Sequence, residues 1–114
     1  MFLSEIIHDV PTETSWIISS DSWQGIIKLL KPLGCQEFDS EWIIQINDSN
    51  RMNIRSIIEQ NDLGNKIVHT HLIDKKGVKL FYALDAMSMI VVNKNYDTRK
   101  TLSKKFLDLE VYYE

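Results

Sequence analysis

The sequence predicts an α+β fold, a mainly antiparallel sheet with about three helices, on the strength of three observations. Short β-branched and aromatic runs recur along the chain, as strands require. Two of these runs lead into polar clusters that are followed by apolar residues at helical spacing. Two further strand-like runs flank a polar connection containing Gly77, which is typical of a β-hairpin. The expected order is β-α-β-α-β-β-β-α, with the helices mainly on one face of the sheet.

Size and composition predict a single globular domain over residues 1–114. Of the 114 residues, 44% are hydrophobic and 25% charged, as in ordinary globular proteins and unlike disordered chains. A chain of this length buries roughly two thirds of the surface that its unfolded form exposes. One hydrophobic core is therefore enough.

The first strand-to-helix unit covers residues 14–34. TSWIIS at residues 14–19 predicts a buried strand, and the serines and aspartate after it predict a helix N-cap. Apolar residues then recur at every third or fourth position from Trp23 to Leu30. Pro32 disfavours helical geometry at the residue before it and Gly34 favours the left-handed conformation, so we expect the helix to end near Leu30.

A second unit of the same kind follows. EWIIQIN at residues 41–47 predicts a strand, and residues 48–50 supply capping oxygens for a helix that carries Ile54, Ile57 and Ile58. We expect Gly64 to stop that helix.

The last third of the chain predicts a meander and a helix. Residues 66–74 and 78–84 are the strands of the hairpin, and residues 88–93 continue it. Asp97 or Thr98 is expected to cap a final helix. The ending EVYYE is either one more short strand or a packed tail.

Charge is divided between the two ends of the sequence. Residues 1–62 contain ten acidic and four basic residues, a net charge of −6, whereas residues 63–114 contain six acidic and nine basic residues, a net charge of +3. Such asymmetry concerns partners and encounter rates and not the fold.

Several features predict a cytoplasmic protein without a membrane span. The start MFLSEIIHDV lacks the basic region of a signal peptide, and no apolar stretch approaches the about 20 residues that a membrane span needs. Cys35 is the only cysteine, so no internal disulfide forms, which agrees with a reducing compartment. It follows a helix end, gains no help from a helix N-terminus in lowering its pKa, and is expected to be a buried small hydrophobe and not a nucleophile.

Two patterns raise the possibility of catalysis. His69 and His71 are two apart on an expected strand and therefore share a face, as metal-binding imidazoles do, but a catalytic zinc needs three protein ligands. Glu37, Asp39 and Glu41 alternate along an extended segment and are expected to share a face, as paired catalytic carboxylates do or as a solvated strand edge does. We expect neither a metal nor a cofactor.

Nucleic acid is not the partner that the composition favours. No glycine-rich phosphate loop occurs, and the net charge of the chain is −3, whereas nucleic-acid-binding domains are usually basic. The basic residues that favour such a role all lie in the second half: Lys75, Lys76, Lys79, Lys94, Arg99, Lys100, Lys104 and Lys105, with Tyr82 or Tyr96 as stacking partners.

The aromatic residues are mostly expected in the core. Trp16, Trp42, Phe81 and Phe106 lie in apolar runs. Trp23 begins a helix beside Asp21, and tryptophan at an acidic rim is typical of an interface anchor.

In size, acidity and α+β pattern the chain resembles the small immunity proteins and antitoxins with which bacteria block their own nuclease toxins. The resemblance is one of profile across all 114 residues, so it transfers no family's contact residues. It implies a one-to-one complex in which carboxylates cover the toxin's substrate-binding cleft and imitate phosphate charge.

We therefore predict a non-enzymatic inhibitor that binds a basic protein, such as a cognate toxin, through an acidic surface. The residues predicted for that surface lie near strand-to-helix turns: Asp21, Trp23, Glu37, Asp39, Glu41 and Asp48. The alternatives are a metal-assisted hydrolase using His69 and His71, and a small RNA-binding or regulatory domain using the basic C-terminal half.

Overall fold

The computed structural model describes residues 2–114, which form an α+β fold. In this part of the chain there are four α-helices: α1 (Phe2–Asp9), α2 (Gly25–Leu30), α3 (Arg51–Asn61) and α4 (Thr101–Lys105). There are seven strands: β1 (Thr14–Ser19), β2 (Gln36–Phe38), β3 (Glu41–Ile46), β4 (Thr70–Ile73), β5 (Lys79–Leu84), β6 (Met89–Val92) and β7 (Val111–Tyr113). Short 3₁₀ turns, Lys31–Leu33 and Leu63–Asn65, follow α2 and α3.

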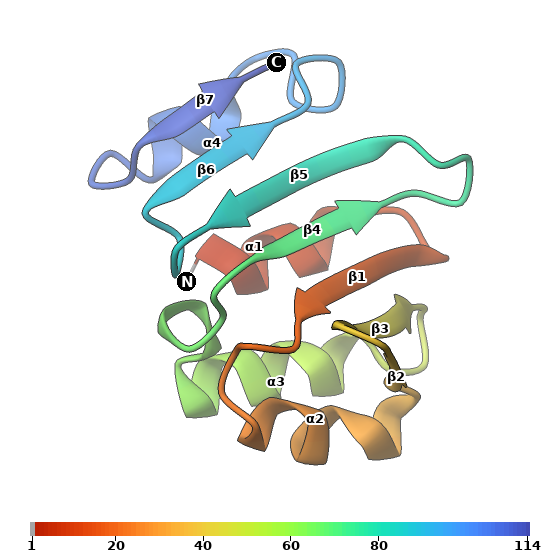
Figure 1. Ribbon diagram of the computed structural model, residues 1–114. Helices are drawn as coiled ribbons and strands as arrows, with labels where there is room; N and C mark the ends of the chain where they lie inside the picture. The colour runs from red at the N-terminus through yellow and green to blue at the C-terminus, as the bar shows by residue number, and fades with distance from the viewer. Residues whose placement is uncertain (1) are drawn as a thin grey trace.

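The strands form one sheet in the order β2-β3-β1-β4-β5-β6-β7 (Figure 1). All neighbours are antiparallel except β6 and β7, which are parallel. The three strands from the first half of the sequence lie together, and the four from the second half lie together. β1 and β4 join the two halves.

The helices lie on one face of this sheet, as the sequence predicted (Figure 1). Burial alternates along β1 and β3, so every second side chain points into the core beneath the helices. The covered face carries the large core side chains of the strands: Trp16, Ile18, Trp42, Ile44, Leu72, Phe81 and Ile90. No helix within residues 2–114 lies over the opposite face (Figure 1).

Helix α1 ties the two halves of the sheet together. Phe2 contacts two aromatic rings from the second half, with centroid distances of 5.8 Å to Phe81 and 5.0 Å to Phe106. Glu5 forms an ion pair with Lys105 at 2.9 Å. The spacing of Phe2, Ile6 and Val10 already carried a helical signal, but α1 was not among the predicted elements, so the expectation of about three helices falls one short.

Most of the predicted elements are confirmed. Helix α2 ends at Leu30, and Gly34 adopts a left-handed φ of 107° after the short 3₁₀ turn. The hairpin of β4 and β5 closes through Asp74 and Gly77, where the Gly77 amide donates to the Asp74 carbonyl at 3.0 Å. The EVYYE ending forms the short strand β7.

The predicted boundaries of α2 and α3 were wrong at three points. Helix α2 begins at Gly25 and not at Trp23, because the Ser19 and Ser22 hydroxyls accept the amides of His69 and Val68 instead of capping the helix. The capping oxygens before α3 were predicted at residues 48–50. The turn is instead closed by the side-chain oxygen of Asn47, which accepts the amides of Ser49 and Asn50. Helix α3 ends at Asn61, before Gly64, because Asp62 takes the left-handed conformation with φ 51°.

The predicted order also lacked β2, whose three residues are all exposed and show no alternation. Helix α4 begins later than predicted, with Lys100 at its N-cap, but the Asp97 carboxylate does accept the amides of Thr101 and Leu102 at 2.9 and 3.0 Å. No helix within residues 2–114 combines the length and apolar character of a membrane span.

Candidate functional site

The end of the sheet where β1 stops brings separate turns together. Because β1 and β3 are antiparallel, the last residue of β1, Ser19, lies opposite the first residue of β3, Glu41. The Ser20 amide donates to the Ser40 carbonyl at 2.9 Å and holds the segment after β1 against the β2–β3 turn. These contacts fix the position of the two segments that carry the predicted acidic residues.

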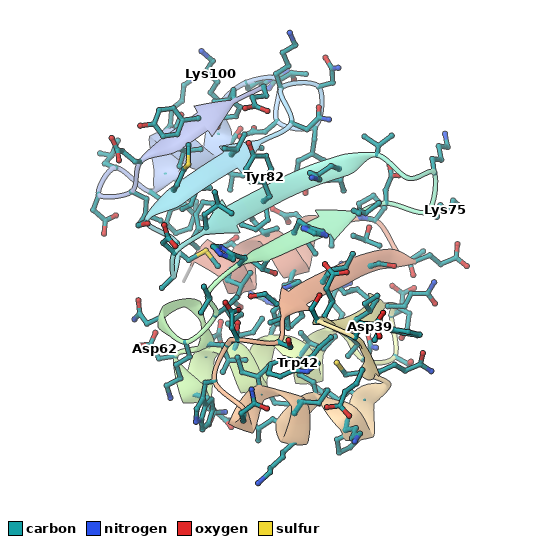
Figure 2. The ribbon with its side chains drawn as sticks, in the orientation of Figure 1. Asp39, Trp42, Asp62, Lys75, Tyr82 and Lys100 are labelled. Carbon is teal, nitrogen blue, oxygen red and sulfur yellow. The ribbon has the colours of Figure 1, made fainter. Side chains whose placement is uncertain are left out.

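Three of those carboxylates gather here, and we call Asp21, Asp39 and Glu41 the acidic end. Asp21 and Asp39 are exposed and Glu41 is half-buried (Figure 2 labels Asp39). Within residues 2–114 none of the three forms an ion pair. A shallow depression of about 390 Å³ lies between the segments, lined by Ser19, Ser20, Asp21, Ser40, Glu41 and His69.

Two predicted residues do not belong to this group. Asp48 follows β3, which runs antiparallel to β1, so it lies at the opposite end of the sheet from Asp21; there it is 4.0 Å from Arg51. Glu37 lies on β2 opposite the core residue Trp42 and forms an ion pair with Lys31 at 3.5 Å. The expectation that Glu37, Asp39 and Glu41 share a face was wrong, because a turn at Asp39, with φ 43°, separates two strands.

Two exposed aromatic side chains flank the acidic end. Trp23 is 45% exposed, its ring lies against Gly25, and the Lys66 ammonium is 4.5 Å from the ring centroid. Phe38 is 52% exposed and pairs across the strands with Glu41, so both side chains lie on the face without helices. Phe38 was not among the predicted residues.

Strand direction adds two further carboxylates that sequence reasoning missed. Asp85 follows β5 and Glu110 precedes β7, and both are exposed at the same end of the sheet as the acidic end. Their position could have been predicted, because alternate turns of a meander lie at the same end of the sheet. Both residues belong to the half of the sequence with net positive charge.

The two histidines lie in different surroundings. His69 lines the depression at the acidic end, whereas His71 lies on β4 between Ile17 and Tyr82. Partial burial and the Lys79 charge lower the pKa of His71. Among the described residues, no group of three His, Cys, Asp or Glu side chains is placed to hold a metal ion.

Cys35 is buried, as predicted, and burial raises the pKa of its thiol to about 11. A thiol that remains protonated at neutral pH is a poor nucleophile. Trp16, Trp42 and Phe81 are core residues, also as predicted, whereas Phe106 is half-buried and packs against the core.

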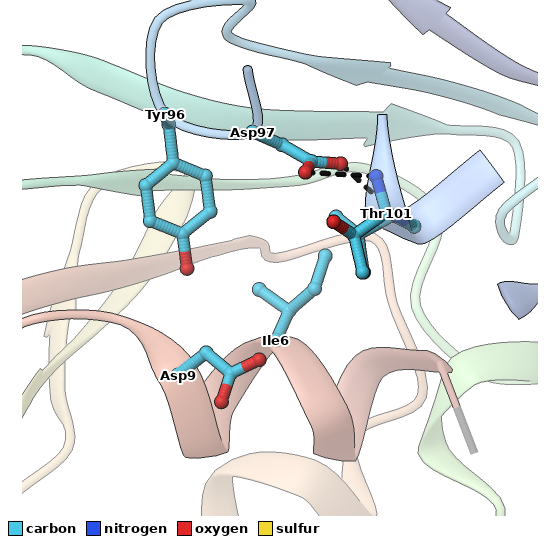
Figure 3. Close-up of a pocket in the computed structure, with 6 residues that line it drawn as sticks. Ile6, Asp9, Tyr96, Asp97 and Thr101 are labelled. Atoms are coloured by element: carbon cyan, nitrogen blue, oxygen red, sulfur yellow. Dashed lines mark hydrogen bonds between the residues drawn. The ribbon is translucent and has the colours of Figure 1, made fainter. Parts of the chain in front are cut away.

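Another pocket, of about 250 Å³, lies beneath α4 and contains Asp9, Tyr96 and Asp97 (Figure 3). Burial, with the nearby Asp9 and Asp97 charges, raises the pKa of Tyr96 to about 12. The Asp97 carboxylate already accepts two α4 amides and the Tyr113 hydroxyl. These hydrogen bonds tie the Asp97 carboxylate to α4 and to β7.

The basic residues of the second half do not form one patch. Lys75 lies at the tip of the β4–β5 hairpin and Lys100 near α4, well separated from it (Figure 2). Lys75 and Lys105 are paired with Glu13 and Glu5 from the first half of the chain.

Comparisons with protein-family models, with curated proteins and with solved structures gave no match to this chain.

Proposed function

We propose that this chain is a non-enzymatic inhibitor that binds a basic protein through the acidic end. One observation carries the proposal: Asp21, Asp39 and Glu41 gather on adjoining segments without an ion pair among residues 2–114. Carboxylates that are not neutralised within the molecule raise its attraction for cations at that place.

The acidic end and its neighbours provide the two components of a protein interface. Unpaired charges steer an oppositely charged partner and raise association rates by about 10 to 1,000-fold. Trp23 and Phe38 supply exposed apolar area, and aromatic anchors slow dissociation.

The partner that this chemistry fits best is a nuclease-type toxin, and the chain then acts as its immunity protein in the cytoplasm. A nuclease binds phosphates in a basic cleft, so carboxylates at the acidic end would occupy the places of phosphates. Such an inhibitor needs neither a cofactor nor a catalytic group of its own.

The test is capture of the natural partner from the source cell, with the chain immobilised. The main variant carries Asp21→Asn, Asp39→Asn and Glu41→Gln, since asparagine tolerates the positive φ at position 39. We expect the association rate of the identified basic partner to fall by at least about tenfold at low salt, with a smaller difference at high salt.

A matched pair of single variants controls for overall charge. Asp21→Lys and Asp48→Lys change the net charge equally, but only Asp21 lies at the acidic end. Equal loss of binding in both, or unchanged binding in the triple variant, contradicts this placement of the interface.

A further inference from the structure

A row of side chains crosses the whole sheet on the face without helices. Each residue of the row is the register partner of the next, from β2 at one edge to β7 at the other: Gln36, Ile43, Ile17, His71, Tyr82, Val91 and Tyr112. Directly paired residues of a sheet point to the same face. The row therefore forms a continuous stripe, which we call the open-face row.

Five of the seven side chains in the open-face row are apolar or aromatic: Ile43, Ile17, Tyr82, Val91 and Tyr112. Ile17, Ile43 and Tyr82 are half-buried, and Tyr112 is exposed. Val91 is only 3% exposed, yet it is not part of the core cluster beneath the helices. Apolar side chains thus lie next to one another on a face that no helix of residues 2–114 covers.

The size of this stripe suits a protein partner. Seven strands at a spacing of about 4.8 Å extend over about 29 Å. A standard interface buries about 800 Å² on each partner, a patch of roughly this width.

The charges beside the open-face row favour one kind of partner. The neighbouring row on the same face includes Phe38 and Glu41, so the acidic end adjoins the stripe directly. Asp85 follows β5 at the same end of the sheet as the acidic end. On the other side of the row stands Lys79, whose ammonium is 5.2 Å from the Tyr82 ring centroid. An apolar stripe bordered by unpaired carboxylates is complementary to apolar side chains bordered by lysine or arginine.

We propose that the open-face row is the apolar part of the binding surface and docks a protein segment that combines apolar and basic side chains. This inference rests on the proposed function and extends it, because it makes the acidic end the rim of a larger interface. RNA is a poorer match, since carboxylates at the acidic end repel phosphates. A second copy of the chain would bring the same carboxylates to the interface.

Three synthetic peptides of equal length test the proposal against the ¹⁵N-labelled chain. One alternates lysine with leucine, one lysine with serine, and one serine with leucine. We expect the lysine–leucine peptide to bind at least about tenfold more tightly than either of the others. Its amide shift changes should follow Ile17, His71 and Tyr82 and continue to Glu41.

Variants assign the effect to the row. Tyr82→Ser should weaken binding of the lysine–leucine peptide. Tyr112→Ser should do the same with little risk to folding, because Tyr112 is exposed on an edge strand. Met52→Ser is the matched control, an exposed apolar residue on α3, on the helix side of the sheet, and should leave binding unchanged.

The outcomes separate this inference from the proposed function. If the lysine–serine peptide binds equally well, with shifts confined to the acidic end, the open-face inference is overturned and the proposed function stands. If neither basic peptide binds, both are contradicted. Equal binding of the serine–leucine peptide, binding of a uridine oligonucleotide to the face, or a dimer by sedimentation that uses it, each overturns the choice of partner.

Discussion

The carboxylates at the two ends of the sheet are used in different ways. Beyond β6, Asp97 accepts two backbone amides and the Tyr113 hydroxyl, and in the β4–β5 hairpin Asp74 accepts the amides of Lys76 and Val78. At the acidic end, Asp21, Asp39 and Glu41 form no ion pair within residues 2–114. The first group stabilises turns and a helix terminus. The second does nothing comparable for the fold and remains accessible to a partner.

Removal of one carboxylate from each group should affect stability very differently. Asp97→Ala should lower the free energy of unfolding by about 2–3 kcal/mol, because the α4 cap and the Tyr113 hydrogen bond are both lost. Asp21→Ala should change it by less than about 0.5 kcal/mol, as surface substitutions usually do. Urea denaturation of the two variants and the unmodified chain measures both values. Similar losses in the two variants would mean that the acidic end also serves the fold.

The pH dependence of stability should also differ between the two groups of carboxylates. Partial burial acts to raise the pKa of Asp97, but the Leu102 amide, the Tyr113 hydroxyl and the Thr101 contacts outweigh it, and the pKa is lowered. A carboxyl with a lowered folded pKa stabilises the fold above its unfolded pKa and loses that contribution as the pH falls through the folded pKa.

The stability difference between the unmodified chain and Asp97→Asn should therefore be constant near neutral pH and shrink below about pH 4. Urea denaturation at a series of pH values measures it. Asp21→Asn is the control for the loss of a carboxylate at the acidic end. A difference for Asp97→Asn that does not change with pH would contradict the role given to the carboxylate.

The smallest change in stability is expected from a substitution next to Trp23, which flanks the acidic end. In Gly25→Ala the new Cβ would overlap the Trp23 ring, so the ring must leave its place and the Lys66 contact. We expect a change of less than about 1 kcal/mol in stability, because alanine is the better helix former and the ring is partly exposed. Trp23 fluorescence should shift to longer wavelength, with a Trp23→Phe variant as the reference. An unchanged spectrum would show that the ring does not depend on Gly25.

Periodicity explains how much of the fold could be predicted. β1, β3 and β4 have one buried face, so their alternation is visible in the sequence. β2 has three exposed residues and gains its structure only by pairing with β3, which a single segment does not reveal. The apolar residues of helix α1 recur at helical spacing, so this helix could have been predicted from the sequence.

The position of each site residue could be predicted only where the direction of its strand in the sheet was known. Asp21 and Asp48 each follow a strand, which suggested one shared location, but antiparallel neighbours end at opposite ends of a sheet. Asp39 and Glu41 lie with Asp21 because the β2–β3 turn points the same way as the end of β1. The open-face row could not be predicted, since it depends on the register of all seven strands.

The division of the sheet into two halves has a consequence for assembly of the chain. The β1–β4 pairing and the Trp16 indole, which donates to the Thr70 hydroxyl at 2.7 Å, hold one half to the other, and α1 reaches across to Phe81. Cleavage in the connection before β4 would leave two fragments, each with half of a core exposed to water. Mixed together, they should recombine into the native sheet, while either one alone stays unfolded.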